Sequence, residues 1–192
     1  LMPEDVSKGM AEGRYLLVDV REPNEVAVEA YPDGVVVPLQ SFDPAVLGWM
    51  HRTHSVEQIA VAVARLRDAE IPDLSLDLIF GLPASLGRDW EADLEQALVL
   101  RPGHLSLYGL TVEDHTPLAR WAARGEVEPV DEDRYAAEFL RADTVLGHAG
   151  YEHYETSAYC KPGMGSRHNI NYWRFGDYLG IGRVPHGIVA GG

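Results

Sequence analysis

Three side chains stand out because their types and surroundings suit chemistry. Asp77 lies within Leu74–Phe80, an otherwise apolar run, and a buried carboxylate is costly unless a partner stabilises its charge. The guanidinium of Arg52 can pair with a carboxylate, and the imidazole of His168, in an aromatic-rich segment, is a common metal ligand. Each also has a structural interpretation: Asp77 bonded to backbone N–H groups, Arg52 as a surface cation, and His168 hydrogen-bonded in an aromatic core.

Composition narrows the classes of function. The chain has 192 residues, of which 46% are hydrophobic, so it can bury a core. With 16 Lys and Arg against 30 Asp and Glu, the net charge of −14 repels phosphate backbones and argues against a nucleic-acid partner. No run approaches the roughly 18 apolar residues of a membrane span, and the first residues do not resemble a signal peptide. The single cysteine, Cys160, fits a reducing cytoplasm, and we interpret it as an incidental, partly buried thiol.

Residues 1–39 are expected to form helix, strand, helix and strand, and beyond them hydrophobic periodicity and capping residues predict four helices. A capping box of Ser55 and Gln58 begins a helix over 55–70. Apolar stripes predict further helices near 88–100, with Trp90, Leu94, Ala97 and Leu98 on the buried side, and over 131–150, capped by Asp131. Thr116 and Pro117 begin a shorter helix that Gly125 closes.

Short runs rich in β-formers predict strands at 16–20, 35–37, 74–80 and 105–110, and one or two more within 151–180. Strands separated by helix-length connections form parallel βαβ units, which we expect over 1–39 and over 74–111. The fold class is therefore α/β with mostly parallel strands. The pattern alone does not choose between an open sheet and part of a barrel.

The N-terminal segment resembles one known family. The run LVDVREPNE at 17–25, followed by GVVVPL at 34–39, is similar to the N-terminal half of a rhodanese-like domain. In that family the sulfur-carrying cysteine sits in a loop after the next strand, and this sequence has no cysteine before Cys160. The resemblance, over residues 1–42, thus stops before the catalytic part.

A longer resemblance covers residues 40–187. The runs QSFDP (40–44), HRTHS (51–55), DLIFGLP (77–83) and LSLY (105–108) are similar to the radical S-adenosylmethionine (SAM) family of oxygen-independent coproporphyrinogen III oxidases. The run SRHNINYW (166–173) resembles the haem chaperone branch of that family. The resemblance implies a partial (β/α) barrel whose family members hold a [4Fe-4S] cluster and SAM at the carboxyl ends of the strands.

The resemblance also implies roles for four residues. Gln40, Arg52 and Asp77 match positions that contact SAM, and His168 lies in the run implicated in holding haem. Radical SAM chemistry needs three cysteine thiolates for its cluster, and this sequence contains one cysteine. We therefore expect no bound cluster, no catalytic residue and no other metal site, SAM affinity no tighter than millimolar, and haem or porphyrin as the remaining ligand.

The two resemblances meet near residue 40 and predict three segments. These are a rhodanese-like fragment at 1–39, an incomplete radical SAM barrel at 40–115, and a C-terminal helical or α+β region at 116–192. We expect a chimera or a gene fragment that is inactive by itself. Two alternatives stay open: a sulfurtransferase-related activity in the rhodanese-like part, and a non-enzymatic binding module that forms a homodimer through open sheet edges.

Overall fold

The computed structural model describes residues 35–68, 74–175, 178–179 and 187–188. They form two compact units, one within residues 31–164 and one from residue 165 onward. Residues 40–115 and 116–164 thus belong to one unit. The rhodanese-like fragment predicted at 1–39 lies almost wholly outside the described residues, as does the strand predicted at 16–20.

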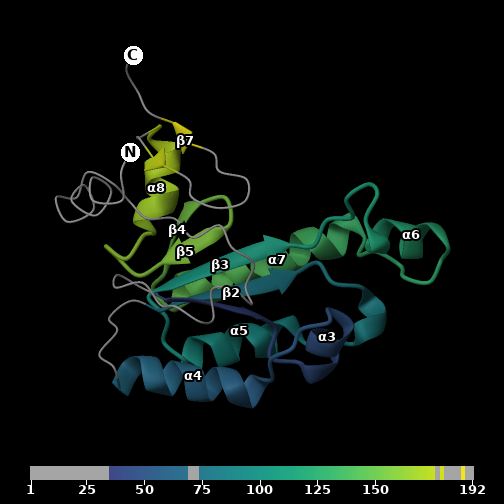
Figure 1. The fold of residues 1–192 in the computed structure, drawn as a ribbon, viewed down its shortest axis with the longest axis horizontal. Helices are drawn as coiled ribbons and strands as arrows, with labels where there is room; N and C mark the ends of the chain where they lie inside the picture. The colour runs from purple at the N-terminus through teal and green to yellow at the C-terminus, as the bar shows by residue number, and fades with distance from the viewer. Residues whose placement is uncertain (1–34, 69–73, 176–177, 180–186, 189–192) are drawn as a thin grey trace. The chain divides into compact units, whose positions relative to one another are not determined.

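A five-stranded sheet forms the centre of the first unit, in the order β1-β2-β3-β5-β4 (Figure 1). Strands β1 (Val35–Gln40), β2 (Leu74–Phe80) and β3 (His104–Gly109) run parallel. The predicted βαβ unit over 74–111 is confirmed, because β2 and β3 pair in parallel with helix α5 between them.

The prediction of mostly parallel strands is wrong for the other half of the sheet. Strands β4 (Glu152–Glu155) and β5 (Ala158–Cys160) form a hairpin, and β5 pairs antiparallel to β3. Only Thr156 and Ser157 separate the two strands, and so short a connection permits only antiparallel pairing. The sheet is therefore mixed.

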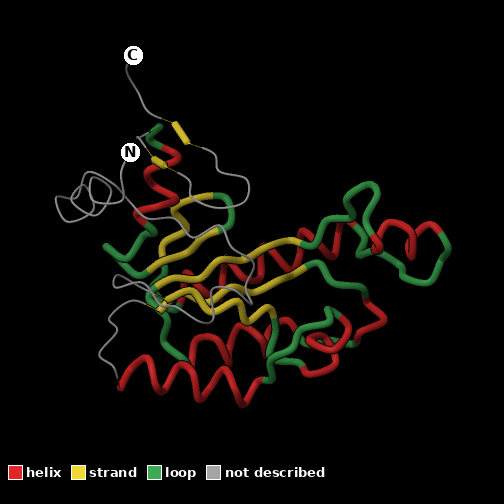
Figure 2. The backbone as a smooth tube through the Cα atoms, in the orientation of Figure 1, coloured by secondary structure: helices red, strands yellow, loops and turns green. Residues whose placement is uncertain are grey.

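Three long helices share one hydrophobic core with the sheet (Figures 1 and 2). They are α4 (Val56–Asp68), α5 (Trp90–Val99) and α7 (Glu132–His148). Each contributes fully or nearly fully buried residues, and four strands of the sheet add others. The core includes Leu39, Ile59, Val63, Leu94, Ala97, Ala142, Leu146, Leu76, Leu78, Phe80, Leu105, Leu107 and Tyr159. Because side chains alternate along a strand, the core residues of β2 and β3 leave the intervening ones on the opposite face.

Local capping explains where these helices begin. Ser55 and Gln58 form the predicted capping box, with Ser55 N–H donating to Gln58 Oε1 at 2.8 Å. Asp131 accepts from Arg134 N–H at 2.8 Å, and Thr116 caps α6 (Pro117–Ala123). In the described part of the first unit, helix α3 (Pro44–Trp49) and the 3₁₀ turn η1 (Ala84–Leu86) were not expected from periodicity.

The second unit is small. It contains helix α8 (Arg167–Trp173) and a two-stranded antiparallel pair of β6 (Tyr178–Leu179) and β7 (Gly187–Ile188). Within the described residues of both units, no helix is long and apolar enough to cross a membrane.

Candidate functional site

The face of the sheet opposite the helices carries polar side chains. We call it the polar face and define it by Ser75 and Asp77 of β2 and His104, Ser106 and Tyr108 of β3, which alternate with the core positions. Ile79, the next residue of β2 on this side, is apolar and belongs to a separate small cluster. Five polar residues at consecutive facing positions would be unusual for a second core. The polar face is therefore where this unit can bind a polar ligand.

Asp77 is a partly buried carboxylate at the centre of the polar face. Its strand partner is Ser106, whose hydroxyl forms a hydrogen bond with it. Burial raises the pKa of Asp77 to about 6, and the bond from Ser106 only partly offsets this shift. Among the described residues, no Lys, Arg or His forms an ion pair with Asp77. Such a carboxylate costs stability and is suited to bind a ligand's donors.

Gln40 ends β1 beside Asp77. Its Cα pairs with that of Leu78, the next residue along β2, after a register shift that begins at Val37. Gln40 has a φ of 71°, which is uncommon for a residue other than glycine. This backbone conformation turns the chain sharply at the carboxyl end of the strand, and the side chain is largely buried there.

Arg52 lies in the loop between α3 and α4, where its backbone N–H donates to the carbonyl of Leu47 at 2.9 Å. The loop stays close to the end of β1, because the His54 ring nitrogen lies 3.3 Å from the Leu39 carbonyl oxygen. The Nε atom of Arg52 is buried and has no hydrogen-bond partner in the described part of the chain. An N–H group buried in this way is suited to an anionic ligand group.

The predicted SAM residues thus share one neighbourhood. Gln40 and Asp77 come from paired strands, and Arg52 comes from the loop that follows β1 and α3. The sequence prediction missed Ser106 and Tyr108 of the polar face. Alternation along 104–109 would have placed them beside Asp77, once the parallel pairing of β2 and β3 was known.

The other end of the polar face is closed by a hydrogen-bonded chain. Ser75 Oγ lies 2.8 Å from His104 Nδ1, and His104 Nε2 lies 2.7 Å from the Tyr154 hydroxyl. Burial lowers the pKa of His104 to about 4. These hydrogen bonds join β2, β3 and β4 at the amino ends of the parallel strands. Residues at that end of such folds serve stability more than catalysis.

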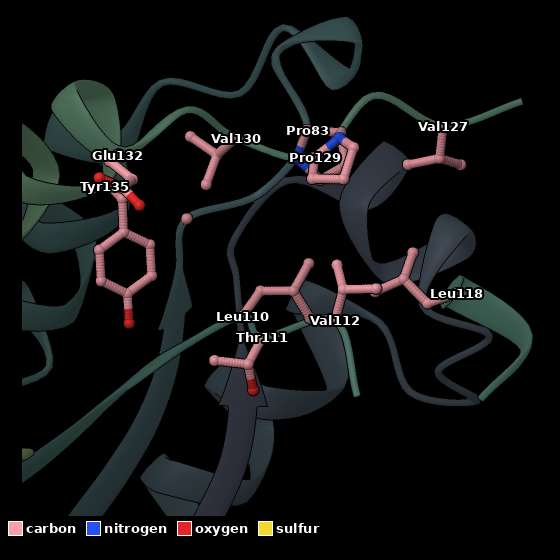
Figure 3. Close-up of a pocket in the computed structure, with 11 residues that line it drawn as sticks. Pro83, Leu110, Thr111, Val112, Leu118, Val127, Pro129, Val130, Glu132 and Tyr135 are labelled. Carbon is pink, nitrogen blue, oxygen red and sulfur yellow. The ribbon is translucent and has the colours of Figure 1, made fainter. Parts of the chain in front are cut away.

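An apolar pocket of about 280 Å³ lies beyond the carboxyl ends of β2 and β3 (Figure 3). It is lined from the loops after both strands, from α6 and its following loop, and from the start of α7, by Gly81, Pro83, Leu110, Thr111, Val112, Leu118, Val127, Pro129, Val130, Glu132 and Tyr135. Ligands in α/β folds bind outside the carboxyl ends of the strands, so the pocket extends the same edge that Gln40 occupies.

His168 belongs to α8, in the second unit. The predicted haem-binding run therefore folds as a helix, which the sequence reasoning did not foresee. Trp173 at its end is 60% exposed, and the nearby Phe175 is 81% exposed. Cys160 is buried in β5, and burial raises the pKa of its thiol, so it is not a reactive thiolate.

Comparison with solved structures identifies the class of fold. Coproporphyrinogen III oxidase (HemN) from Escherichia coli, described as a radical SAM enzyme, matches with a TM-score of 0.64 at 17% identity, over 86% of this chain and 41% of that one. Over most of its length, the chain therefore shares part of the fold of that structure.

Sequence comparison finds similar curated proteins. The chain is 40% identical to Heme chaperone HemW of Escherichia coli over 155 residues, which are 81% of this chain and 40% of the relative. It is 34% identical to HemW of Lactococcus lactis over 167 residues, with coverages of 87% and 44%. It is 35% identical to the mouse mitochondrial radical S-adenosyl methionine domain-containing protein 1 over 198 residues, with coverages of 95% and 44%.

The chain is thus related to HemW- and HemN-like radical SAM proteins, as the sequence resemblance predicted, and it spans about two fifths of the length of these curated relatives. No protein-family model matches it.

Proposed function

We propose that this chain is a haem-binding part of a HemW-like protein and that haem binds at the α8 segment. The observation that carries this proposal is that His168 and Trp173 lie on the same short helix, with the Trp173 side chain largely exposed. Imidazole is a common axial ligand of haem iron, and exposed aromatic rings can pack against a porphyrin. The names of the relatives, heme chaperones, support the same ligand.

A haem titration followed by the Soret band tests the proposal. The wild-type chain should give a shifted and saturable band, and His168→Ala should lose the shift. His148→Ala is the matched control, because His148 is an exposed histidine at the end of α7, and its spectrum should equal the wild type. Identical spectra for wild type and His168→Ala would remove His168 from the proposal.

A second proposal concerns SAM at the polar face. Asp77 can accept hydrogen bonds from ribose hydroxyls or an ammonium group, and the guanidinium of Arg52 can pair with the ligand's carboxylate. Within the described residues, Asp77 has no cationic partner and the buried Arg52 Nε has no hydrogen-bond partner, and both features fit a zwitterionic nucleoside ligand. In radical SAM proteins an iron–sulfur cluster supplies the electron that cleaves SAM, and its thiolates would have to come from outside these 192 residues, which include one cysteine.

Without the cluster to anchor it, SAM should bind this chain no more tightly than the millimolar range. Isothermal titration of the wild-type chain should show no tighter binding, and NMR titration at millimolar SAM should shift amides of β1 and β2. Asp77→Asn should abolish those shifts, while Asp114→Asn, an exposed control in the loop before α6, should keep them. A micromolar dissociation constant would overturn the expectation that SAM affinity stays in the millimolar range without the cluster.

Two other functions make distinct predictions. A sulfurtransferase needs a reactive thiolate, and Cys160 is buried with a raised pKa, so thiosulfate and cyanide should yield no thiocyanate above background. A non-enzymatic binding module could pair through β1 or β4, the edge strands of the five-stranded sheet in the described residues. Light scattering that shows a dimer without bound haem would favour the binding module.

A further inference from the structure

Three buried charged side chains and one half-buried one, Arg134, form a network near the ends of β1 and β2. They are Arg88 in the loop before α5, Asp93 of α5, and Arg134 and Glu138 of α7, and we call them the Arg88 network. The side chains of Arg88 and Asp93 are 1% and 3% exposed. Two positive charges balance two negative ones, which reduces the cost of burying them.

One end of the network holds the chain after β1. Asp93 Oδ2 accepts from Ser41 Oγ at 2.7 Å, and its Oδ1 accepts from the backbone N–H of Phe42 at 2.7 Å. Ser41 and Phe42 follow Gln40 directly, and Gln40 has the positive φ of 71°. A residue persists in such a conformation when its surroundings over-determine it. The two bonds to Asp93 provide that constraint on the carboxyl side of Gln40.

The other end of the network holds the turn after β2. Glu138 Oε2 accepts from the backbone N–H of Gly81 at 2.8 Å, and Gly81 has a φ of 71°. Glu138 Oε1 accepts from Arg134 Nε at 3.0 Å. The turn and the end of β1 are therefore each tied to one buried carboxylate.

Arg88 connects the two carboxylates. Its Nη2 donates to Glu138 Oε2 at 2.7 Å, and its Nη1 donates to the Ile79 carbonyl at 3.0 Å while lying 3.5 Å from Asp93 Oδ2. The ring of Trp90 lies 4.7 Å from the guanidinium carbon and fixes its plane further. The two carboxylates therefore share one guanidinium.

We propose that Arg88, Asp93 and Glu138 are positioning residues that set the conformations of Gln40 and of the Gly81 turn together. The ends of β1 and β2 then respond as one unit when a ligand reaches the polar face. This inference rests on the proposed SAM site for its ligand, but the coupling between the two strand ends can be measured without any ligand.

Amide hydrogen exchange followed by NMR in the whole chain measures that coupling at Phe42 and Gly81. Asp93→Asn removes the charge that faces Arg88, so exchange at both amides should accelerate about tenfold, the scale of one lost hydrogen bond to a charged group. Ser41→Ala breaks one bond and leaves every buried charge in place. It should accelerate amide exchange strongly at Phe42 and more weakly at Gly81. Ser41→Ala therefore still tests the coupling if Asp93→Asn does not fold.

Two controls separate positioning from general loss of stability. Asp89→Asn changes an exposed carboxylate that caps the same helix α5, and Asn caps equally well, so both amides should keep their wild-type rates. The Leu107 amide of β3, bonded to the Ser157 carbonyl, should not change in any variant. The proposal would be overturned by unchanged exchange at Gly81 in both Asp93→Asn and Ser41→Ala, or by equal acceleration of exchange at Leu107.

The same samples, titrated with millimolar SAM, test the ligand step. In the wild type, the amide resonances of Phe42 and Gly81 should both shift. Asp93→Asn should raise the half-saturation concentration about tenfold, as expected if one charged hydrogen bond supports the site. If the wild type shows no shift, the SAM proposal fails while the exchange data still decide the coupling.

Discussion

Replacing Asp77 by asparagine should make this protein more stable at neutral pH. Burial raises the pKa of Asp77 to about 6, whereas an unfolded aspartate titrates near 4. Between these values the folded state holds a proton that the unfolded state has released. The contribution of Asp77 to stability is therefore present at low pH and is lost as the pH rises from about 4 to about 6.

The size of the effect follows from the shift. A difference of about two pKa units corresponds to about 3 kcal/mol, and we reduce this to about 1–3 kcal/mol because Asp77 is only partly buried and solvent screens part of the interaction. An amide has the same shape and no charge to desolvate. Asp77→Asn should thus raise the free energy of unfolding by about 1–3 kcal/mol at pH 7 and leave it nearly unchanged at pH 4.

Urea unfolding of both proteins between pH 4 and pH 8 measures this difference. His104 adds an opposite slope, because its pKa is lowered to about 4 by burial, so its contribution is lost as the pH falls from about 6.5 to 4. That slope is common to both proteins and cancels when they are subtracted at each pH. Asp114→Asn should change stability by less than about 0.5 kcal/mol throughout.

A loss of stability in Asp77→Asn at pH 7 would refute the reasoning. It would mean that the carboxylate makes bonds that stabilise the fold more than its burial costs. Asp77 would then be a structural residue, and its place in the SAM proposal would have no physical support.

Three further predictions concern unfolding by urea. Gly81→Ala should lose about 2–4 kcal/mol, because its φ is 71° and a Cβ would lie 2.7 Å from the Tyr135 ring, whereas Gly125→Ala, with open space around it, should lose only about 1–2 kcal/mol. Leu94→Ala should lose about 2–5 kcal/mol, and Leu140→Ala, 62% exposed, less than about 0.5 kcal/mol. Asp131→Ala should lose about 1 kcal/mol by uncapping α7. Equal losses of stability within either pair of variants would contradict the packing described above. Wild-type stability in Asp131→Ala would contradict the capping.

The long elements were predictable because their patterns are local. Trp90, Leu94 and Ala97 are buried on α5 as their spacing predicted, and the stripe of α7 buries Ala142 and Leu146. Helices α3 and α8 were missed because six or seven residues make fewer than about two turns, too short for a hydrophobic period to show. The direction of β4 and β5 was also missed, since strand pairing depends on partners distant in sequence.

By itself, the sequence determined the cysteine count, and with it the fact that these 192 residues cannot supply three thiolates. It also located Asp77 as a charge in an apolar strand. Only the tertiary structure decided what surrounds that strand. Ser41 reaches Asp93 across 52 residues and Arg88 reaches Glu138 across 50. Such contacts leave no local pattern, because they depend on how strands and helices far apart in the chain pack together.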